Sequence, residues 1–135
     1  MSGRANHFFR YRFPAIFWAL VIYAASSIPA NDLPNIFLLK FDKLIHIGIF
    51  FVLGVLVYRA LEPYIRAERF DWKRAILVVV IVIAYAFSDE FHQSSVPGRS
   101  VDGNDILADT VGGMLSGLFV YVLFLLKRRA ARTAL

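Results

Sequence analysis

The chain alternates between long apolar stretches and short polar connections. Charged residues or Pro and Gly separate four such stretches, which cover about residues 13–28, 44–57, 75–87 and 106–126. Within the third stretch, residues 75–84 are all apolar and leave no polar face for a helix in water. The pattern therefore predicts helices inside a membrane rather than the amphipathic helices of a soluble bundle.

The thickness of a bilayer decides where these helices must begin and end. A hydrocarbon core about 30 Å thick needs about 20 helical residues, and only the last stretch reaches that length without charged residues. The second becomes long enough when it includes Asp42, Lys43 and His46, and the third when it includes residues 89–93. We therefore predict an all-α fold, one domain over residues 1–135, with four transmembrane helices at about 13–28, 41–61, 74–93 and 104–126.

Composition and charge support this interpretation and indicate how the helices are oriented across the membrane. Of the 135 residues, 59% are hydrophobic and 19% charged, which is too apolar for a typical soluble domain, and the absence of Cys excludes thiolate chemistry. The net charge of +5 comes from Lys and Arg that gather at the N-terminus, in the second connection and in the C-terminal tail. By the positive-inside rule, both termini are predicted to be cytoplasmic. The basic charge is thus explained by the orientation of the protein in the membrane, so no nucleic-acid partner is expected.

Polar residues recur at a similar depth in all four predicted helices. At about 1.5 Å per residue, they lie about 20 to 27 Å from the cytoplasmic basic residue of their own helix. Ionisable groups inside a membrane are costly and usually mark a pathway or a site. We expect one polar layer in the outer leaflet, to which the successive helices contribute Ser26, His46, Glu90 and Asp109.

Helical spacing predicts which of these side chains share a face. Asp42 and His46 are four residues apart, and Gln93 projects between Asp89 and Glu90, whereas His92 points elsewhere. In the last helix, a stripe of polar or small residues should face the other helices, and two glycines at an i, i+4 spacing should allow close packing. The stripe consists of Asp105, Asp109, Gly112 and Ser116, and the glycine pair of Gly113 and Gly117.

Four motifs occur in order along the chain. They are Asp42-Lys43-Leu-Ile-His46, Asp89-Glu90-Phe-His-Gln93, Pro97-Gly98-Arg99 and Asp105-Ile-Leu-Ala-Asp109-Thr-Val-Gly112. Together they resemble the VanZ-like family of small bacterial membrane proteins. The resemblance implies a multi-pass protein of the bacterial inner membrane, with a role in low susceptibility to teicoplanin-type glycopeptides. The chain departs from the family pattern at Asp109, where the family usually has Asn.

The first hypothesis for this layer is a site that binds an envelope lipid or acts on its phosphate. Arg99 and Lys43 would hold the phosphate, while His46, oriented by Asp42 or Glu90, would act as acid, base or nucleophile. The candidate residues are, for chemistry, Asp42, His46 and Glu90 and, for ligand binding, Ser26, Lys43, Gln93, Arg99, Asp105 and Asp109. Membrane lipids, including a phosphorylated envelope lipid or a lipoglycopeptide, are the expected partners.

Two other hypotheses stay open. His46 with Glu90, Asp109 or Asp105 can bind a divalent metal ion, although no paired-histidine metal motif occurs, so no metal ligand is assigned and the cofactor is left unknown. Alternatively, the layer only locks the helices together, and the protein serves transport or partner binding. In that case Asp42 would pair with Lys43, and Arg99 with an acid such as Glu90.

Overall fold

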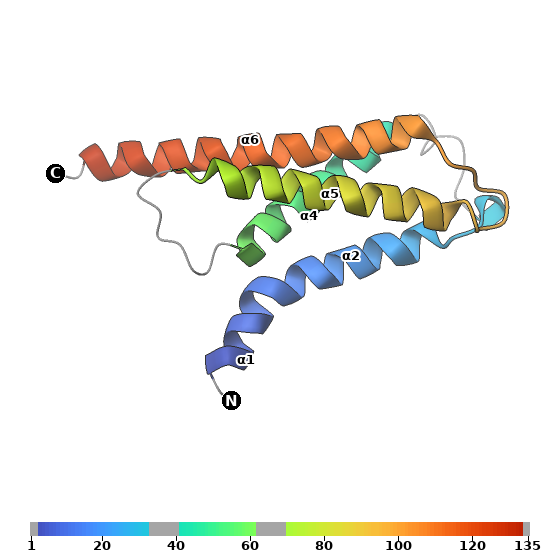
Figure 1. Ribbon diagram of the computed structural model, residues 1–135, viewed down its shortest axis with the longest axis horizontal. Coiled ribbons are helices and arrows are strands. Elements are labelled where there is room, and N and C mark those ends of the chain that lie inside the picture. The colour runs from blue at the N-terminus through green and yellow to red at the C-terminus, as the bar shows by residue number, and fades with distance from the viewer. Residues whose placement is uncertain (1–2, 33–40, 62–69, 134–135) are drawn as a thin grey trace.

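The computed structural model describes residues 3–32, 41–61 and 70–133 (Figure 1). All regular secondary structure in these ranges is helical, which confirms the predicted all-α class. The elements are α1 (Gly3–His7), a π-helical segment (Phe8–Arg12), α2 (Phe13–Ser26), a 3-10 turn (Ala30–Asp32), α4 (Asp42–Leu61), α5 (Trp72–Gln93) and α6 (Gly103–Thr133).

The observed helix ends follow local chemistry. Helix α2 ends at Ser26, short of the predicted residue 28, because a residue before proline, here Ile28, disfavours the helical conformation. Helix α5 begins where the Asp71 carboxylate accepts the N–H of Arg74 at 3.1 Å, a contact that also lowers the pKa of Asp71. Helix α6 runs to Thr133, beyond the predicted residue 126, because Lys, Arg and Ala favour helix even where charge ends the apolar span.

Three of the described helices, α4, α5 and α6, are long and apolar enough to cross a membrane. Helix α2 has 14 residues and is shorter than a full crossing, although it continues without a break from the π-helical segment and α1. Three spans are thus supported, and a fourth crossing by the first helix stays a prediction.

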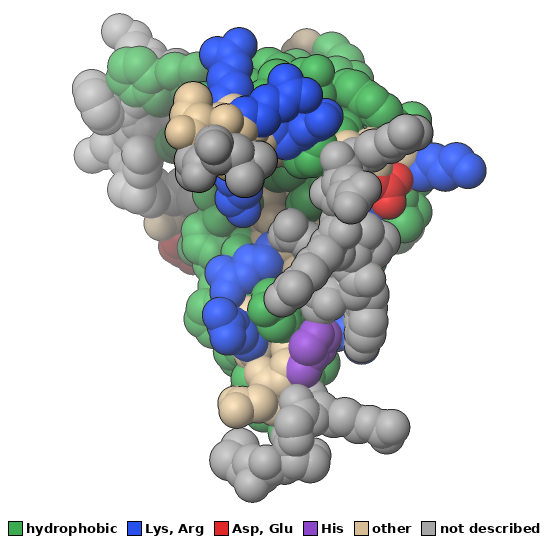
Figure 2. All heavy atoms as spheres, turned by 90° about the vertical axis from the view of Figure 1, so that its left-hand side faces the viewer, with side chains coloured by type: hydrophobic (Ala, Val, Ile, Leu, Met, Phe, Trp, Pro, Cys, Tyr) green, Lys and Arg blue, Asp and Glu red, His purple; other side chains and the backbone are tan. Residues whose placement is uncertain are grey.

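The helices meet at two ends of different character. In Figure 1, α1 begins and α6 ends at the left, whereas the last turns of α2 and α5 and the first turn of α6 lie at the right. Figure 2 looks onto the left end, where Lys and Arg side chains are spread over the surface and acidic side chains are few. The start of α1 and the end of α6 therefore lie on the same side of the bundle, and the assignment of the termini to the cytoplasm stays a prediction.

The polarity of the molecule is reversed relative to that of a soluble protein. Large apolar side chains face outward, with Phe91, Leu107 and Ile76 exposed at 80%, 65% and 62%. Carboxylates lie inside, with Glu90 and Asp109 exposed at 1% and 0%. Such a surface suits hydrocarbon better than water. The apolar core lies in the middle of the helices, between α4 and α5, with Ile22 of α2 packed against it.

Helix α2 is joined to this core by two aromatic hydrogen bonds. The Trp18 indole N–H donates to the carbonyl of Ile49 at 3.0 Å, and the Tyr85 hydroxyl donates to the carbonyl of Ala19 at 2.5 Å. Each hydrogen bond gives a partner to the polar group of an aromatic side chain that is otherwise surrounded by apolar groups. These contacts hold α2 against both α4 and α5.

Close packing between α4, α5 and α6 depends on particular glycines. A Cβ at Gly112 would lie 2.4 Å from the Ile47 carbonyl oxygen, and one at Gly113 would lie 2.9 Å from a Val82 methyl group. A Cβ at Gly117 would meet nothing within 4 Å, because Gly117 lines an open groove between α5 and α6 with a volume of about 340 Å³. The predicted close approach therefore occurs at Gly113 but not at Gly117.

Matched substitutions on one helix test this packing. Gly112→Ala should lower the free energy of unfolding by about 1–3 kcal/mol, because the new methyl group meets backbone that cannot move aside. Gly117→Ala should be neutral or stabilising, since it adds about 1 kcal/mol of helix propensity in open space. Thermal unfolding in detergent measures both, and equal behaviour of the two variants would contradict the packing described here.

Candidate functional site

The polar residues that contact one another come from the elements at the right-hand end of Figure 1, where α4 and α6 begin and α2 and α5 end. Among the described residues they form two groups, and the members of each group are linked by hydrogen bonds or ion pairs. The first, called here the His46 cluster, contains Asp42, Lys43, His46, Asp102, Asp105 and Asp109. The second, called here the Ser26 network, contains Ser26, Asp89, Gln93 and Arg99.

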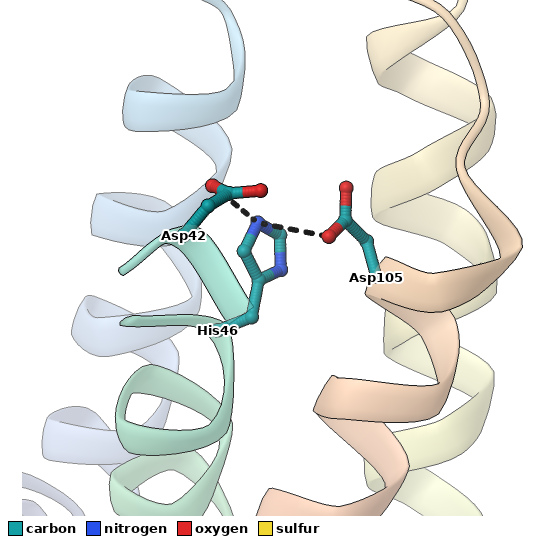
Figure 3. Close-up of side chains that lie close together, drawn as sticks. All are labelled: Asp42, His46 and Asp105. Atoms are coloured by element: carbon teal, nitrogen blue, oxygen red, sulfur yellow. Dashed lines mark ion pairs between the residues drawn. The ribbon is translucent and has the colours of Figure 1, made fainter. Parts of the chain in front are cut away.

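His46 is the centre of the first cluster. Its Nδ1 lies 2.9 Å from Oδ1 of Asp109, and its Nε2 lies 3.8 Å from Asp42 Oδ1 and 3.9 Å from Asp105 Oδ1. Figure 3 shows the imidazole between Asp42 and Asp105, which come from α4 and α6. With Asp109 ionised, a neutral His46 donates from Nδ1, so its Nε2 carries the lone pair that faces the other two acids.

Lys43 supplies the positive charge of this cluster. Its Nζ is 2.9 Å from Asp102 Oδ2 and 3.4 Å from Asp42 Oδ2, and it also contacts Asp105 Oδ1. The Lys43 hydrogen bond, helped by the N–H of Asn104, keeps the pKa of Asp102 below its usual value, so Asp102 is ionised at neutral pH. The predicted pairing of Lys43 with Asp42 is present, but Lys43 is shared with two acids from the other side of the site.

Glu90 adjoins the His46 cluster from α5. Its Oε2 accepts the backbone N–H of Asp102 at 2.9 Å, while its Oε1 has no hydrogen-bond partner among the described residues. Glu90 thus joins the segment before α6 to the end of α5.

The Ser26 network links α2, α5 and the connection that follows α5. Ser26 donates to Asp89 Oδ2 at 2.8 Å, and Gln93 Nε2 donates to the same oxygen at 3.1 Å. A guanidinium nitrogen of Arg99 donates to Gln93 Oε1 at 2.6 Å. The alternative ion pair of Arg99 with Glu90 or Asp102 does not occur among the described residues.

The geometry agrees with several facing predictions. His92 lies apart from Glu90, since its ring stacks on Tyr23 at 4.2 Å between centroids and its Nε2 is 2.9 Å from Ser27 Oγ. The stripe on α6 faces inward as predicted, because all its members are buried: Asp105, Asp109, Gly112 and Ser116.

Two residues of these groups were not among the candidates from sequence. Asp89 is 4% exposed and accepts two hydrogen bonds, and its position four residues before Gln93 is a signal that could have identified it. Asp102 pairs with Lys43, which is 59 residues away, and nothing in the sequence indicates this contact.

The fold and the site together define a helical membrane protein with a buried acid and histidine cluster near one end of its helices. A family model, VanZ/LLP1, matches residues 6–126, and the chain therefore belongs to the VanZ/LLP1 family. No curated protein and no solved structure matches the chain.

The Ser26 network yields a test of its own. Ser26→Ala removes a donor to a buried carboxylate and should lower stability by about 1–3 kcal/mol. Ser94→Ala is the matched control, because the Ser94 hydroxyl is exposed and bonds only to the Phe91 carbonyl among the described residues. Thermal unfolding in detergent should separate the two, and an unchanged Ser26→Ala variant would show that the network is not required for stability.

Proposed function

We propose that this VanZ/LLP1 protein binds the phosphorylated headgroup of an envelope lipid at the outer leaflet of the bacterial cytoplasmic membrane, with His46 as the group that transfers a proton. The observation that carries the proposal is the contact between His46 and the fully buried Asp109. A carboxylate on Nδ1 holds the imidazole in one tautomer and leaves Nε2 as the base. Through this lipid, the protein would lower susceptibility to teicoplanin-type glycopeptides.

The position of the site supports a lipid ligand. The cluster lies at the ends of membrane-length helices, where a headgroup meets the polar layer while the acyl chains lie along the apolar outer surface. Arg99 supports the recognition of phosphate. It is half-buried, and its contact with Gln93 uses one nitrogen of a guanidinium that carries five N–H donors.

Lys43 contributes differently from the role predicted for it. Its ammonium lies among three carboxylates, so it offsets their charge instead of standing free for a phosphate. The phosphate contact is therefore assigned to Arg99, and Lys43, Asp105 and Asp42 adjust the charge around His46.

Native mass spectrometry of the full chain tests lipid binding. The protein would be released from nanodiscs containing a polyprenyl phosphate, an anionic phospholipid and a zwitterionic phospholipid. We expect retention of the polyprenyl phosphate or the anionic phospholipid, and about a 10-fold loss of this retention in His46→Ala, equivalent to about 1.4 kcal/mol. His92→Ala is the control, since its ring lies in the separate contact with Tyr23 and Ser27. Equal retention in both variants would refute the assignment of His46.

The second candidate is a non-catalytic transport or partner-binding protein in which the polar layer is structural. Its support is the extent of mutual pairing, since Lys43 contacts three carboxylates and Asp89 has two donors. Interhelical polar contacts in membranes contribute only about 0.6 kcal/mol on average, so a costly layer is a poor means of joining helices.

Stability distinguishes these candidates. If His46 belongs to a ligand site, His46→Ala should leave the thermal unfolding midpoint unchanged or raise it, because binding sites are rarely optimised for stability. If the layer is structural, the same variant should unfold earlier, since Asp109 would lose its partner. Lipid-free protein in detergent is the sample for this measurement, so that ligand loss does not contribute to the result.

A further inference from the structure

We propose that Asp42, His46 and Asp105 bind a divalent transition-metal ion, Zn²⁺ or Mn²⁺, between the first turns of α4 and α6. One nitrogen of His46 and one carboxylate oxygen of each acid lie within 4.8 Å of one another (Figure 3). The inference goes beyond the proposed function, because the ion site needs no lipid. While the ion is bound, Nε2 of His46 is a ligand, so proton transfer by His46 belongs to the ion-free protein.

The distances suit a shared ion. His46 Nε2 is 3.8 Å from Asp42 Oδ1 and 3.9 Å from Asp105 Oδ1. Zn²⁺ lies about 2.0–2.2 Å from nitrogen and oxygen ligands, so these two nitrogen–oxygen pairs need to approach by only a few tenths of an ångström. The oxygens of Asp42 and Asp105, which lie within 4.8 Å of each other, would move closer by up to about 1 Å. An imidazole with two carboxylates matches the ligand preferences of Zn²⁺ and Mn²⁺.

The other nitrogen of His46 provides an independent argument. Metal-binding histidines almost always donate their second ring N–H to a carboxylate or a carbonyl, which orients the ring and increases its basicity. Asp109 occupies this position, with its Oδ1 2.9 Å from Nδ1 and its side chain 0% exposed. The ring is therefore held with Nε2 toward the two acids, as a metal ligand requires.

Two buried oxygens, one within the His46 cluster and one next to it, also lack hydrogen-bond partners among the described residues. Glu90 Oε1 and Asp109 Oδ2 have no hydrogen-bond partner among the described residues, on side chains exposed at 1% and 0%. Buried carboxylate oxygens without donors are expensive. Glu90 is joined to the cluster through its Oε2, which accepts the N–H of Asp102, so a cation in the cluster would offset part of this cost.

Lys43 is the group that the ion must displace. Its ammonium contacts both Asp42 and Asp105, and its side chain is 43% exposed, so it can move into water when a metal ion takes its place. In the structure, lysine thus offsets part of the negative charge of the cluster. A divalent ion would bring twice the charge of lysine and would offer open coordination positions to an oxygen ligand such as phosphate.

Titration of the lipid-free full chain in detergent with Mn²⁺, followed by the paramagnetic resonance signal of free Mn²⁺, tests the site. We expect one ion per chain with a Kd below about 100 µM, equivalent to about 5.5 kcal/mol, and displacement by Zn²⁺. Asp105→Asn should weaken binding at least about 10-fold, and Lys43→Met should strengthen it by a similar factor. Asp32→Asn, on an exposed turn, removes the same charge and should change nothing.

Thermal unfolding shows whether each variant is folded, so that loss of binding is not confused with loss of structure. Mn²⁺ should raise the unfolding midpoint of the wild type and of Asp32→Asn, but not that of Asp105→Asn. Weak binding that is equal in Asp105→Asn and Asp32→Asn would overturn the proposal. If Mn²⁺ bound only to the Lys43→Met variant and not to the wild type, the proposal would also be overturned, because the lysine ammonium would then occupy the ion position permanently.

The two proposals fail separately. If lipid retention survives a chelator and the wild type binds no Mn²⁺, the ion site is wrong and the lipid site stands. If Mn²⁺ binds at one site per chain and no lipid is retained with or without the ion, the lipid proposal is wrong and the metal site stands.

Discussion

Carboxylates buried between apolar helices must be partnered, and this requirement determines how the helices of this protein meet. An ionisable side chain at mid-membrane costs about 2.5–3.5 kcal/mol on insertion scales. Asp109, Glu90 and Asp89 are all at most 4% exposed, and each has a partner on another element: His46, the N–H of Asp102 and Ser26, respectively. The polar layer and the helix arrangement are therefore linked, because each of these carboxylates finds its partner on another element.

A close backbone approach makes the central contact possible. Aspartate is short, so Asp109 reaches His46 only where α4 and α6 nearly touch. Gly112 lies one turn along α6 from Asp109, and the space that its Cβ would fill is occupied by the carbonyl of Ile47, the residue after His46. A small residue at this position thus allows the hydrogen bond one turn away. Packing and chemistry depend on the same two helix turns.

The sequence could predict which residues lie at one depth, but not which of them pair. Helix register follows from the regular geometry of the helix, so the predicted inward face of α6 agrees with the structure. Pairing depends on the path of the connection between α5 and α6. That segment brings the Asp102 N–H to Glu90 and its carboxylate to Lys43, and it directs Arg99 to Gln93. The periodicity of the helices does not determine the path of this connection. The sequence therefore suggests an acid as the partner of Arg99, whereas the structure places Gln93 there.

Asp109 has two separate effects on His46: it orients the imidazole ring, and it places a negative charge beside it. The VanZ-like pattern that the chain resembles has Asn here, and the side-chain oxygen of either residue accepts a hydrogen bond from Nδ1. The orientation of His46 is therefore available to both. Only aspartate adds a negative charge 2.9 Å from the ring, which increases the basicity of Nε2 as a proton acceptor or metal ligand. Because that charge is fully buried and one of its oxygens has no partner among the described residues, it adds cost without adding rigidity. The carboxylate is thus better explained by chemistry at His46 than by a need to hold the helices together.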